Sequence, residues 1–549
     1  MFVMTAFWRK LSSTVTGGAI IVSSSWFISK LLGFLRERLI LSRFGASPET
    51  DAYNAAFGIP DFIYGTLILG SLLSVFIPVF IHYREQKGND EAFRIANSIL
   101  NIIVITFLAC GVVLFVFAPQ LITLVAPGFD AKRIDLAVEM TRIISINILL
   151  FGVSNVLSGI LNASKRFIAF SIAPILYNVG IVAGILLLVP TYGIRGVAVG
   201  AVIGAVLHVL VQVPSVLRTG FRYRGIMDLK HKGVREIGRL ILPRAFGQSV
   251  TQIAQLVNLI IGSTLVVGSV TVFRAANNVQ DLPITLIGVS LATVVFPVFA
   301  EALARNDRAC FVQHFSRVVR QILFMVIPIS VLFLILRAQA IRVIYGAGQF
   351  DWNATILTAN ALGFFALSFF AQSLIPVLAR SFYAMKDTST PVKITIFAVV
   401  LNIIGSFALS RGFDIGGWHV AGYGVSGLAL SYSISSTIGM LLMYFILRAR
   451  IGDLDDERVI STIVRIIFAC ALMTLLVQGV KYTVVAFGLP TDTGLGILTQ
   501  LVVAGSIGMV GYVAFAAAFG LEEVRFVREW FVRTKRQLMN GRNGDNGTS

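Results

Sequence analysis

Charged residues are scarce in this chain. They make up 13% of its 549 residues, while 56% are hydrophobic. A soluble globular protein carries about 25% charged residues. The mean hydropathy is +0.84. This composition excludes a water-soluble globular protein, and we predict an all-α polytopic membrane protein.

Cysteine and histidine are also rare. The three cysteines, Cys110, Cys310 and Cys470, lie far apart in or beside apolar runs, and the five histidines are scattered. The sequence contains no Cys-x-x-Cys motif, no histidine cluster and no P-loop. Metal binding, redox chemistry and nucleotide hydrolysis therefore lack the residues they need. We expect buried structural cysteines, no cofactor, and a protein that is not an enzyme.

Acidic residues are outnumbered by basic ones, 27 to 45, which gives a formal net charge of +18. Most of the basic residues stand in short loops between apolar runs, so nucleic-acid binding is a poor interpretation. No cleavable signal peptide is evident, because the first apolar run continues into charged helix rather than into a small-residue cleavage site.

Long apolar runs are abundant. A spanning helix needs about 20 mostly apolar residues, and we expect fourteen spans, which cover 17–42, 52–82, 95–118, 137–161, 168–189, 195–217, 237–264, 270–303, 315–336, 355–384, 392–410, 421–447, 461–487 and 495–519. We divide the chain into a cytoplasmic N-terminal segment, an N-lobe of six helices, a basic cytoplasmic loop, a C-lobe of six helices, helices 13 and 14, and a tail. Their respective limits are 1–16, 17–217, 218–236, 237–447, 461–519 and 520–549.

Loop charge predicts the orientation of these spans. The loop after the sixth span is the most basic of all, and the loops on the same side carry further cations, among them Lys165, Arg305, Lys386 and Arg448. The opposite loops are poorer in Lys and Arg. The positive-inside rule therefore places both termini in the cytoplasm. We also expect an amphipathic interfacial helix over 521–536 and disorder over 537–549.

An internal repeat is visible at an offset near 220 residues. The segment from Ser71 to Phe80 resembles the segment from Ser290 to Phe299, each with a proline near its end, and Ala163-Ser-Lys165 resembles Ala384-Met-Lys386. Because six spans separate the copies, both have the same orientation. This predicts two six-helix lobes around a substrate path. The glycines at 196, 200 and 204 predict close helix packing.

Polar residues recur at helical spacing inside three of the apolar runs. One stripe contains Arg244, Gln248, Thr251, Gln255 and Asn258; a second contains Arg274, Asn278, Asp281 and Thr285; and the first span carries Lys30, Arg36 and Glu37. Ionisable groups at membrane depth are costly, so they normally face a water-filled cavity or a partner. Several inward polar faces are typical of a transporter.

Arg36 is the strongest single candidate for binding an anion. Its neighbour Glu37 is adjacent and is expected to project elsewhere, whereas a guanidinium can contact a pyrophosphate bidentately. The alternative is a structural ion pair. Asp51 could act in a gate, pair with an arginine or cap a helix. Asp61 and Asp281 are expected to pair with Arg36, Arg244 or Arg274. Near span ends, Arg142 and Arg380 are expected to snorkel to the interface.

Several motifs together resemble one transporter family. They are Ser29-Lys-Leu-Leu-Gly-Phe-Leu-Arg-Glu37, Thr50-Asp-Ala52, Phe76-Ile-Pro-Val-Phe80, Ala126-Pro-Gly-Phe129, Asn178, and Phe382-Tyr-Ala-Met-Lys-Asp-Thr-Ser-Thr-Pro-Val-Lys393. The chain resembles the MurJ (MviN) lipid II flippases of the multidrug/oligosaccharidyl-lipid/polysaccharide exporter superfamily over nearly all of residues 17–520.

The resemblance implies a V-shaped, two-lobed transporter in the cytoplasmic membrane that alternates between inward-open and outward-open states. Its substrate would be lipid II, an undecaprenyl-pyrophosphate-linked muropeptide, whose pyrophosphate is held by cavity cations. Helices 13 and 14 would form a groove for the lipid tail. Membrane lipids and cell-wall synthesis proteins are the implied partners, and family members are usually linked to the membrane potential.

The sequence also departs from the family pattern. Lys30 stands where an arginine is usual, while Arg36 and Asp51 are kept. Tyr64 and Asn278 stand where many members carry arginines. Arg244 and Arg274 are candidates to supply the missing cations, so the expected substrate site comprises Lys30, Arg36, Asp51, Arg244, Arg274 and Asn278.

Three other functions stay open. The chain could flip another polyprenyl-pyrophosphate-linked glycan, export drugs in exchange for cations, or act as a non-transporting scaffold for cell-wall enzymes. A cation antiporter would favour acidic groups in its cavity, and these stripes are biased towards basic groups. A scaffold has no need of polar stripes.

Overall fold

Helices make up nearly all of the computed structural model, which describes residues 15–67, 72–415, 418–486 and 493–525. The expected disordered tail lies outside the described residues, and so do nearly all of the N-terminal segment and most of the expected amphipathic helix over 521–536. The chain divides into two compact units. Unit 1 comprises Met1–Arg274, Ile344–Ala354 and Ser406–Leu428, and unit 2 comprises Ala275–Val343, Thr355–Gly405 and Ala429–Ser549.

Unit 1 contains the first helices of the chain and two later segments. In order, its helices are α2 (Val15–Phe44), α3 (Pro48–Leu67), α4 (Leu72–Lys87), α5 (Asn89–Val116), α6 (Ala118–Val125), α7 (Ala131–Ile144), α8 (Ile146–Ala163), α9 (Phe167–Leu187), α10 (Val189–Tyr192), α11 (Arg195–Leu210), α12 (Val213–Leu217), α13 (Lys232–Ser263) and the start of α14 (Ser269–Pro283). It also holds the strands β1 (Gly412–Ile415) and β2 (Trp418–Ala421), a short antiparallel pair that an all-α prediction does not include.

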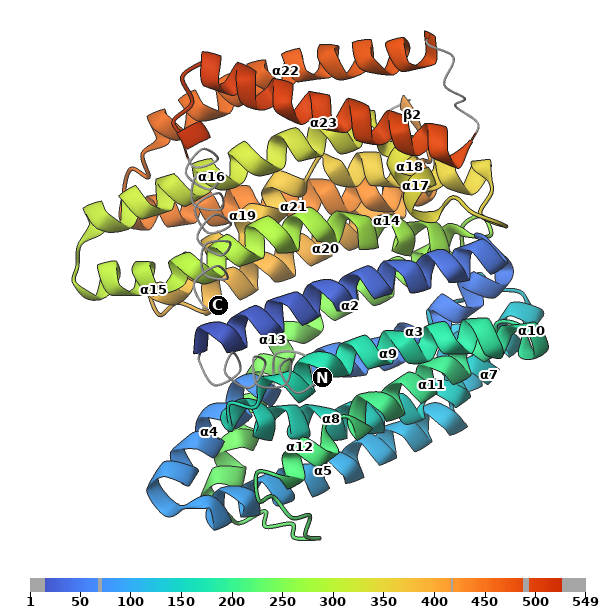
Figure 1. Ribbon diagram of the computed structural model, residues 1–549, viewed down its shortest axis with the longest axis vertical. Helices are drawn as coiled ribbons and strands as arrows, with labels where there is room; N and C mark the ends of the chain where they lie inside the picture. Colours follow the sequence, from blue (N-terminus) through green and yellow to red (C-terminus); the bar gives the residue numbers. More distant parts are fainter. Residues whose placement is uncertain (1–14, 68–71, 416–417, 487–492, 526–549) are drawn as a thin grey trace, which may run out of the picture. The chain divides into compact units, whose positions relative to one another are not determined.

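Unit 2 contains most of the remaining helices (Figure 1). They are the π-helix η1 (Ile284–Val289), α15 (Ser290–Ala304), α16 (Arg308–Ile335), α17 (Arg337–Tyr345), α18 (Trp352–Ala366), α19 (Phe369–Ala384), α20 (Ser389–Arg411), α21 (Val425–Ile451), α22 (Asp456–Ala486) and α23 (Gly494–Ala518). The ends of α17, α18, α20 and α21 belong to unit 1. Helices α22 and α23 run side by side.

Length and apolar composition identify the helices that can cross a membrane. Among the described residues there are 11 such helices, or up to 12 if the pair α18 and α19, bent by 46° at its break, forms one span. The protein is therefore a multi-pass membrane protein, with about 11–12 candidate spans. Two long helices, α2 and α13, are not among them. Both carry the polar residues singled out in the sequence.

Glycines bring α9 and α11 into close contact in unit 1. A Cβ atom at Gly180 would lie 2.3 Å from the Cα of Gly204, and one at Gly184 would lie 2.5 Å from the Cα of Gly200. Any larger residue would therefore force these backbones apart. The predicted role of the glycine series in helix packing is confirmed. α9 also packs against α2, so this tight pair supports the helix that carries Arg36.

The two copies of the internal repeat end a helix in the same way. After α8, Lys165 has φ 55°, and after α19, Lys386 has φ 62°. The amide of the next residue then bonds back five residues, from Arg166 to Leu161 and from Asp387 to Phe382. This left-handed helix cap normally favours glycine, so two lysines in one geometry support the repeat as a real structural correspondence.

Asp387 then begins α20 within unit 2. Its carboxylate accepts hydrogen bonds from the amides of Ser389 and Thr390, at 2.9 and 3.0 Å, and from the Thr390 hydroxyl at 2.5 Å. Arg450, at the end of α21, donates to the same carboxylate at 2.5 Å. The Thr390 hydroxyl, the Thr390 amide and the Arg450 charge lower the pKa of Asp387 below its ordinary value. Asp387 thus links the start of α20 to the end of α21.

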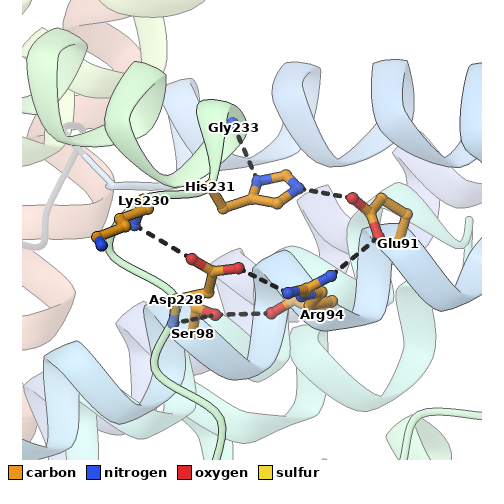
Figure 2. A network of polar contacts seen from close by, with 7 residues as sticks. All are labelled: Glu91, Arg94, Ser98, Asp228, Lys230, His231 and Gly233. Carbon is orange, nitrogen blue, oxygen red and sulfur yellow. Dashed lines mark hydrogen bonds and ion pairs between the residues drawn. The ribbon is translucent and has the colours of Figure 1, made fainter.

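The basic loop between α12 and α13 is held against α5. Asn97 accepts from the amide of Arg224, and Asn101 donates to the carbonyls of Arg224 and Ile226. Figure 2 shows the end of this loop, where Arg94 donates to Asp228 at 2.8 Å and the His231 ring contacts Glu91 at 2.7 Å. The amide of Gly233, in the first turn of α13, donates to the other His231 ring nitrogen. These contacts fix the start of α13 on α5.

Arginines expected near span ends satisfy backbone carbonyls. Arg142 donates to the Phe115 carbonyl at 3.2 Å and lies over the Phe115 ring. Arg380 donates to the carbonyl of Val289, the last residue of η1, at 3.2 Å. In a π-helix, each carbonyl bonds to an amide five residues on instead of four. Arg380 supplies the Val289 carbonyl with a donor.

Candidate functional site

Arg36 and Arg274 are brought together by unit 1, with Asp61 between them. Arg36 lies on α2, Asp61 on α3 and Arg274 in the first half of α14. The positive charges of Arg274 and Arg36 both act on the Asp61 carboxylate. We call these three residues the charge cluster. Ionisable residues within apolar helices are costly, so they usually pair with one another or face a water-filled cavity.

Arg36 is held in place by an amide that sequence reasoning did not assign to the site. Its Nη1 donates to Asn178 Oδ1 at 3.1 Å. The Nδ2 of Asn178 donates to the carbonyl and hydroxyl of Ser29 and to the carbonyl of Pro174, at 3.1, 3.2 and 3.2 Å. Since carbonyls accept only, the nitrogen of Asn178 must face them and its oxygen must face Arg36. Asn178 belongs to the quoted motifs, and that was the available signal.

One donor of Arg36 stays unused. Its Nε is buried and has no hydrogen-bond partner among the described residues. Its Nη2 lies 3.7 Å from Glu37 Oε2, and Glu37 is buried. The expectation that Glu37 points away from Arg36 is thus wrong, because the two adjacent side chains bend towards one another. A buried donor without a partner is costly, so the Arg36 guanidinium is not fully satisfied by the described residues.

Tyrosines complete the surroundings of Arg36. Tyr53 from α3 and Tyr177 from α9 both lie within electrostatic range of its guanidinium. Tyr53 packs against Phe57 with ring centroids 5.0 Å apart, and Tyr177 packs edge-on against Phe151. Tyrosine offers an apolar ring with a polar tip, so these residues enclose the charge without pairing with it.

Asp61 and Arg274 form an ion pair. Arg274 Nη2 lies 3.3 Å from Asp61 Oδ2, and the two side chains are 36% and 51% exposed. The prediction that Asp61 pairs with one of the arginines is therefore confirmed. In this contact the Arg274 side chain turns to α3. The expected pairing of Asp281 with one of the arginines stays a prediction.

Asp51 lies apart from the charge cluster, at the start of α3. Its Oδ1 accepts from the amide and hydroxyl of Thr271, at 2.9 and 2.7 Å, and its Oδ2 accepts from the amide of Gly268 at 2.6 Å. Ser47 and Thr50 already cap α3 by a reciprocal hydrogen-bond pair. Asp51 therefore caps a distant helix, α14, and only 1% of it is exposed.

The other three predicted site residues have different surroundings. Lys30 lies one and a half turns before Arg36 on α2, with its ammonium 6.0 Å from the centre of the Phe34 ring. Arg244, on α13, is exposed and donates to Ser74 Oγ at 2.7 Å. Asn278 belongs to unit 2. The structure brings Arg36 and Arg274 together, and it shows no contact between either of them and Lys30 or Arg244 among the described residues.

Solved structures define the class of protein. An inward-facing multidrug resistance MATE family transporter of the MOP superfamily has a TM-score of 0.66 at 17% identity, covering 80% of this chain and 99% of that one. At that identity the likeness shows the fold alone. A structure described as lipid II flippase MurJ in an inward closed conformation has a TM-score of 0.74 at 25% identity, covering 91% of this chain and 98% of that one. The fold is that of a MOP-superfamily transporter.

The family follows from the sequence comparisons. The family model for the lipid II flippase MurJ matches residues 40–491. Relatives include the lipid II flippase MurJ of Burkholderia cenocepacia, 27% identical over 78% of this chain and 83% of that protein. The probable lipid II flippase MurJ of Rhizobium meliloti is 27% identical over 90% of this chain and 91% of that protein. The chain belongs to the MurJ lipid II flippase family; it is a transporter and not an enzyme.

Proposed function

We propose that this protein moves lipid II from the inner to the outer leaflet of the cytoplasmic membrane by alternating access. The family match over residues 40–491 carries this proposal. The charge cluster supports it, because an intramembrane arginine with an unused buried donor suits a pyrophosphate group. The substrate's muropeptide and polyprenyl parts enter the proposal through the family.

The six predicted site residues receive roles from their contacts. Arg36 is the primary pyrophosphate ligand and Arg274 the second. Lys30 and Arg244 attract the anion electrostatically as it enters, and Asn278 offers an amide one turn beyond Arg274 on α14. For Asp51, whose oxygens already accept three hydrogen bonds, capping or gating is the better role. It acts as a latch between α3 and α14.

The topology that goes with this function has fourteen spans and two cytoplasmic termini. The number fourteen is reached by adding α2 and α13 to the 12 spans that length and composition allow. These two helices have 30 and 32 residues, enough to cross about 30 Å of hydrocarbon. Their polar residues lower their hydropathy, as expected of helices that face a substrate path. Two lobes, 17–217 and 237–447, followed by helices 13 and 14 over 461–519, complete the proposal.

Complementation tests the function. The intact gene should restore growth to a strain depleted of its lipid II flippase, and Arg36→Ala should not, although the variant reaches the membrane in normal amounts. Arg195→Ala is the matched control, because Arg195, on α11, forms a half-exposed ion pair with Glu139, on α7, and neither residue belongs to the charge cluster. Failure of the unaltered chain would favour transport of another polyprenyl-pyrophosphate-linked glycan. Full growth with Arg36→Ala would remove Arg36 from the substrate site.

A further inference from the structure

We propose that Asp61 is a placeholder for the substrate's phosphate: it holds Arg274 while the site is empty and gives it up when the pyrophosphate arrives. Asp61 would thereby set how tightly the substrate is held and how fast it leaves. The inference rests on the proposed function, since it concerns the same substrate. It adds Asp61 to the expected substrate site, whose one acidic residue, Asp51, caps α14 instead.

The geometry of the pair indicates that it can open. One nitrogen of Arg274 contacts one oxygen of Asp61 at 3.3 Å, and both side chains are at least one third exposed. No second hydrogen bond joins these two side chains in the described part of the chain. A single long contact between partly exposed groups is a weak ion pair. The Arg274 guanidinium therefore keeps most of its hydrogen-bond donors available.

A different pair in unit 2 shows what a permanent ion pair looks like. Arg320 Nη1 lies 2.5 Å from Glu523 Oε1, with side chains only 11% and 5% exposed. The same nitrogen also contacts Glu522, and Arg320 Nε donates to Ser316. Breaking such a pair would leave buried charge without compensation. The Asp61–Arg274 pair has neither the burial nor the additional partners, so it is suited to exchange.

A pyrophosphate is the better ligand for Arg274. Phosphate oxygens accept two parallel hydrogen bonds from one guanidinium, and they carry more negative charge than a carboxylate. Arg36, held by Asn178, would contribute a second guanidinium from α2. The anion therefore competes with Asp61 for one arginine while a second arginine stays in place.

Displacement leaves the Asp61 carboxylate beside the bound anion. Like charges repel at this range, so Asp61 weakens the complex that has just formed. A transporter must release what it binds. A ligand shifts the balance between two states of a protein only if its affinity for the two states differs. Asp61 thus lowers the affinity of the site for the substrate and speeds substrate release. At the end of the cycle, Asp61 pairs with Arg274 again.

The test compares lipid II binding by purified full-length variants. Asp61→Asn keeps the shape of the side chain and removes its charge, so it should bind lipid II about two- to fivefold more tightly, with slower dissociation and slower growth in complementation. In an Arg274→Ala background, the gain from Asp61→Asn should shrink, because no arginine is left to be released. Glu139→Gln, which removes the acid from a half-exposed arginine pair elsewhere in unit 1, should leave the dissociation constant unchanged.

The outcomes separate the inference from the function it rests on. Equal or weaker lipid II binding by Asp61→Asn, with unaltered protein that binds and complements, would overturn the placeholder role, because loss of a merely structural pair can only weaken the site. Asp61→Ser provides a second neutral variant in case Asp61→Asn does not fold. If the unaltered protein neither binds lipid II nor complements, the proposed function itself fails.

Discussion

Asn178 Oδ1 accepts a hydrogen bond from Arg36 Nη1 at 3.1 Å across 142 residues of sequence. The amide nitrogen of Asn178 is anchored to Ser29, less than two turns from Arg36 along α2. One side chain of α9 thus fixes both the backbone of α2 and the direction of its principal cation. The position of the guanidinium is decided by this amide rather than by α2 alone.

Asn178→Ala should therefore impair transport while Arg36 itself is unchanged. Without the amide, Arg36 loses an acceptor and gains the freedom to swing towards Glu37. We expect lipid II affinity to fall at least about threefold, in line with a lost hydrogen bond to a charged group, and complementation to weaken. Asn402→Ala is the control, since Asn402 is a buried asparagine of unit 2 that bonds to Ser431 and not to an arginine in that contact. Undiminished lipid II affinity in Asn178→Ala would remove Asn178 from the site.

Arg274 is expected to supply the cation that the family places at Asn278. Arg274→Ala should fail to complement, and adding Asn278→Arg should restore part of the activity. The two positions are one turn apart on α14, a rise of about 6 Å with about 40° of rotation, which a long arginine side chain can span. Growth in the depleted strain is the measurement. Full activity of Arg274→Ala alone would show that no compensation takes place.

Asp51→Ala should destabilise the link between α3 and α14. The substitution strands two buried amides and a hydroxyl that now bond to the carboxylate. Each buried donor left without a partner costs about 1–3 kcal/mol, so thermal unfolding in detergent should occur at a clearly lower temperature. Glu49→Ala, at an exposed position of the same helix, is the control. An unchanged unfolding temperature would mean that the latch is not formed in solution.

The contribution of Asp387 to stability should depend on pH. Its pKa is lower in the folded protein than in the unfolded chain because Thr390 and Arg450 favour the charged carboxylate. The stabilisation is therefore complete above the unfolded pKa, about 4, and is lost as the pH falls through the folded value. Asp387→Asn should unfold at a lower temperature than the unaltered protein at pH 7, and the difference should narrow below about pH 4. A constant difference would rule out the charged interaction.

A cysteine at Met227 should report the side of the membrane on which the α12–α13 loop lies. Met227 is 47% exposed and follows a backbone segment held by α5, so a probe there disturbs no described contact. In intact cells with a cysteine-free background, an impermeant reagent should not label it, because the positive-inside rule makes this loop cytoplasmic. Labelling from outside would invert the proposed topology.

Much of this architecture could be predicted because its causes are local. Apolar length indicates which helices can cross a membrane, and 11–12 of the fourteen expected spans have a candidate helix among the described residues. The repeat was visible in Ala163-Ser-Lys165 and Ala384-Met-Lys386, and both lysines adopt the left-handed conformation that ends the helix before them. The glycine series of α11 likewise predicted close packing, since only the missing Cβ allows it.

The partners of the polar residues could not be predicted in this way. The Asp61–Arg274 pair joins positions 213 residues apart. The local spacing of these residues does not indicate that Asp61 pairs with Arg274 rather than with Arg36 or Arg244. The position of Asp51 predicts a cap for its own helix. Ser47 and Thr50 fill that role, however, and Asp51 caps α14 instead. By length and composition, α2 and α13 fall outside the candidate spans, so the spans expected over 17–42 and 237–264 stay predictions.

The sequence by itself thus determined the class of this protein, the places of most helices, the repeat and the presence of costly charges at membrane depth. Those properties follow from solvation and backbone conformation, which act over a few residues. Only the tertiary structure decided that Arg36 is aimed by Asn178, that Asp61 occupies Arg274, and that Asp51 belongs to α14. A charge within a membrane protein is stabilised by partners on the helices that pack beside it. Helix packing is a property of the whole chain.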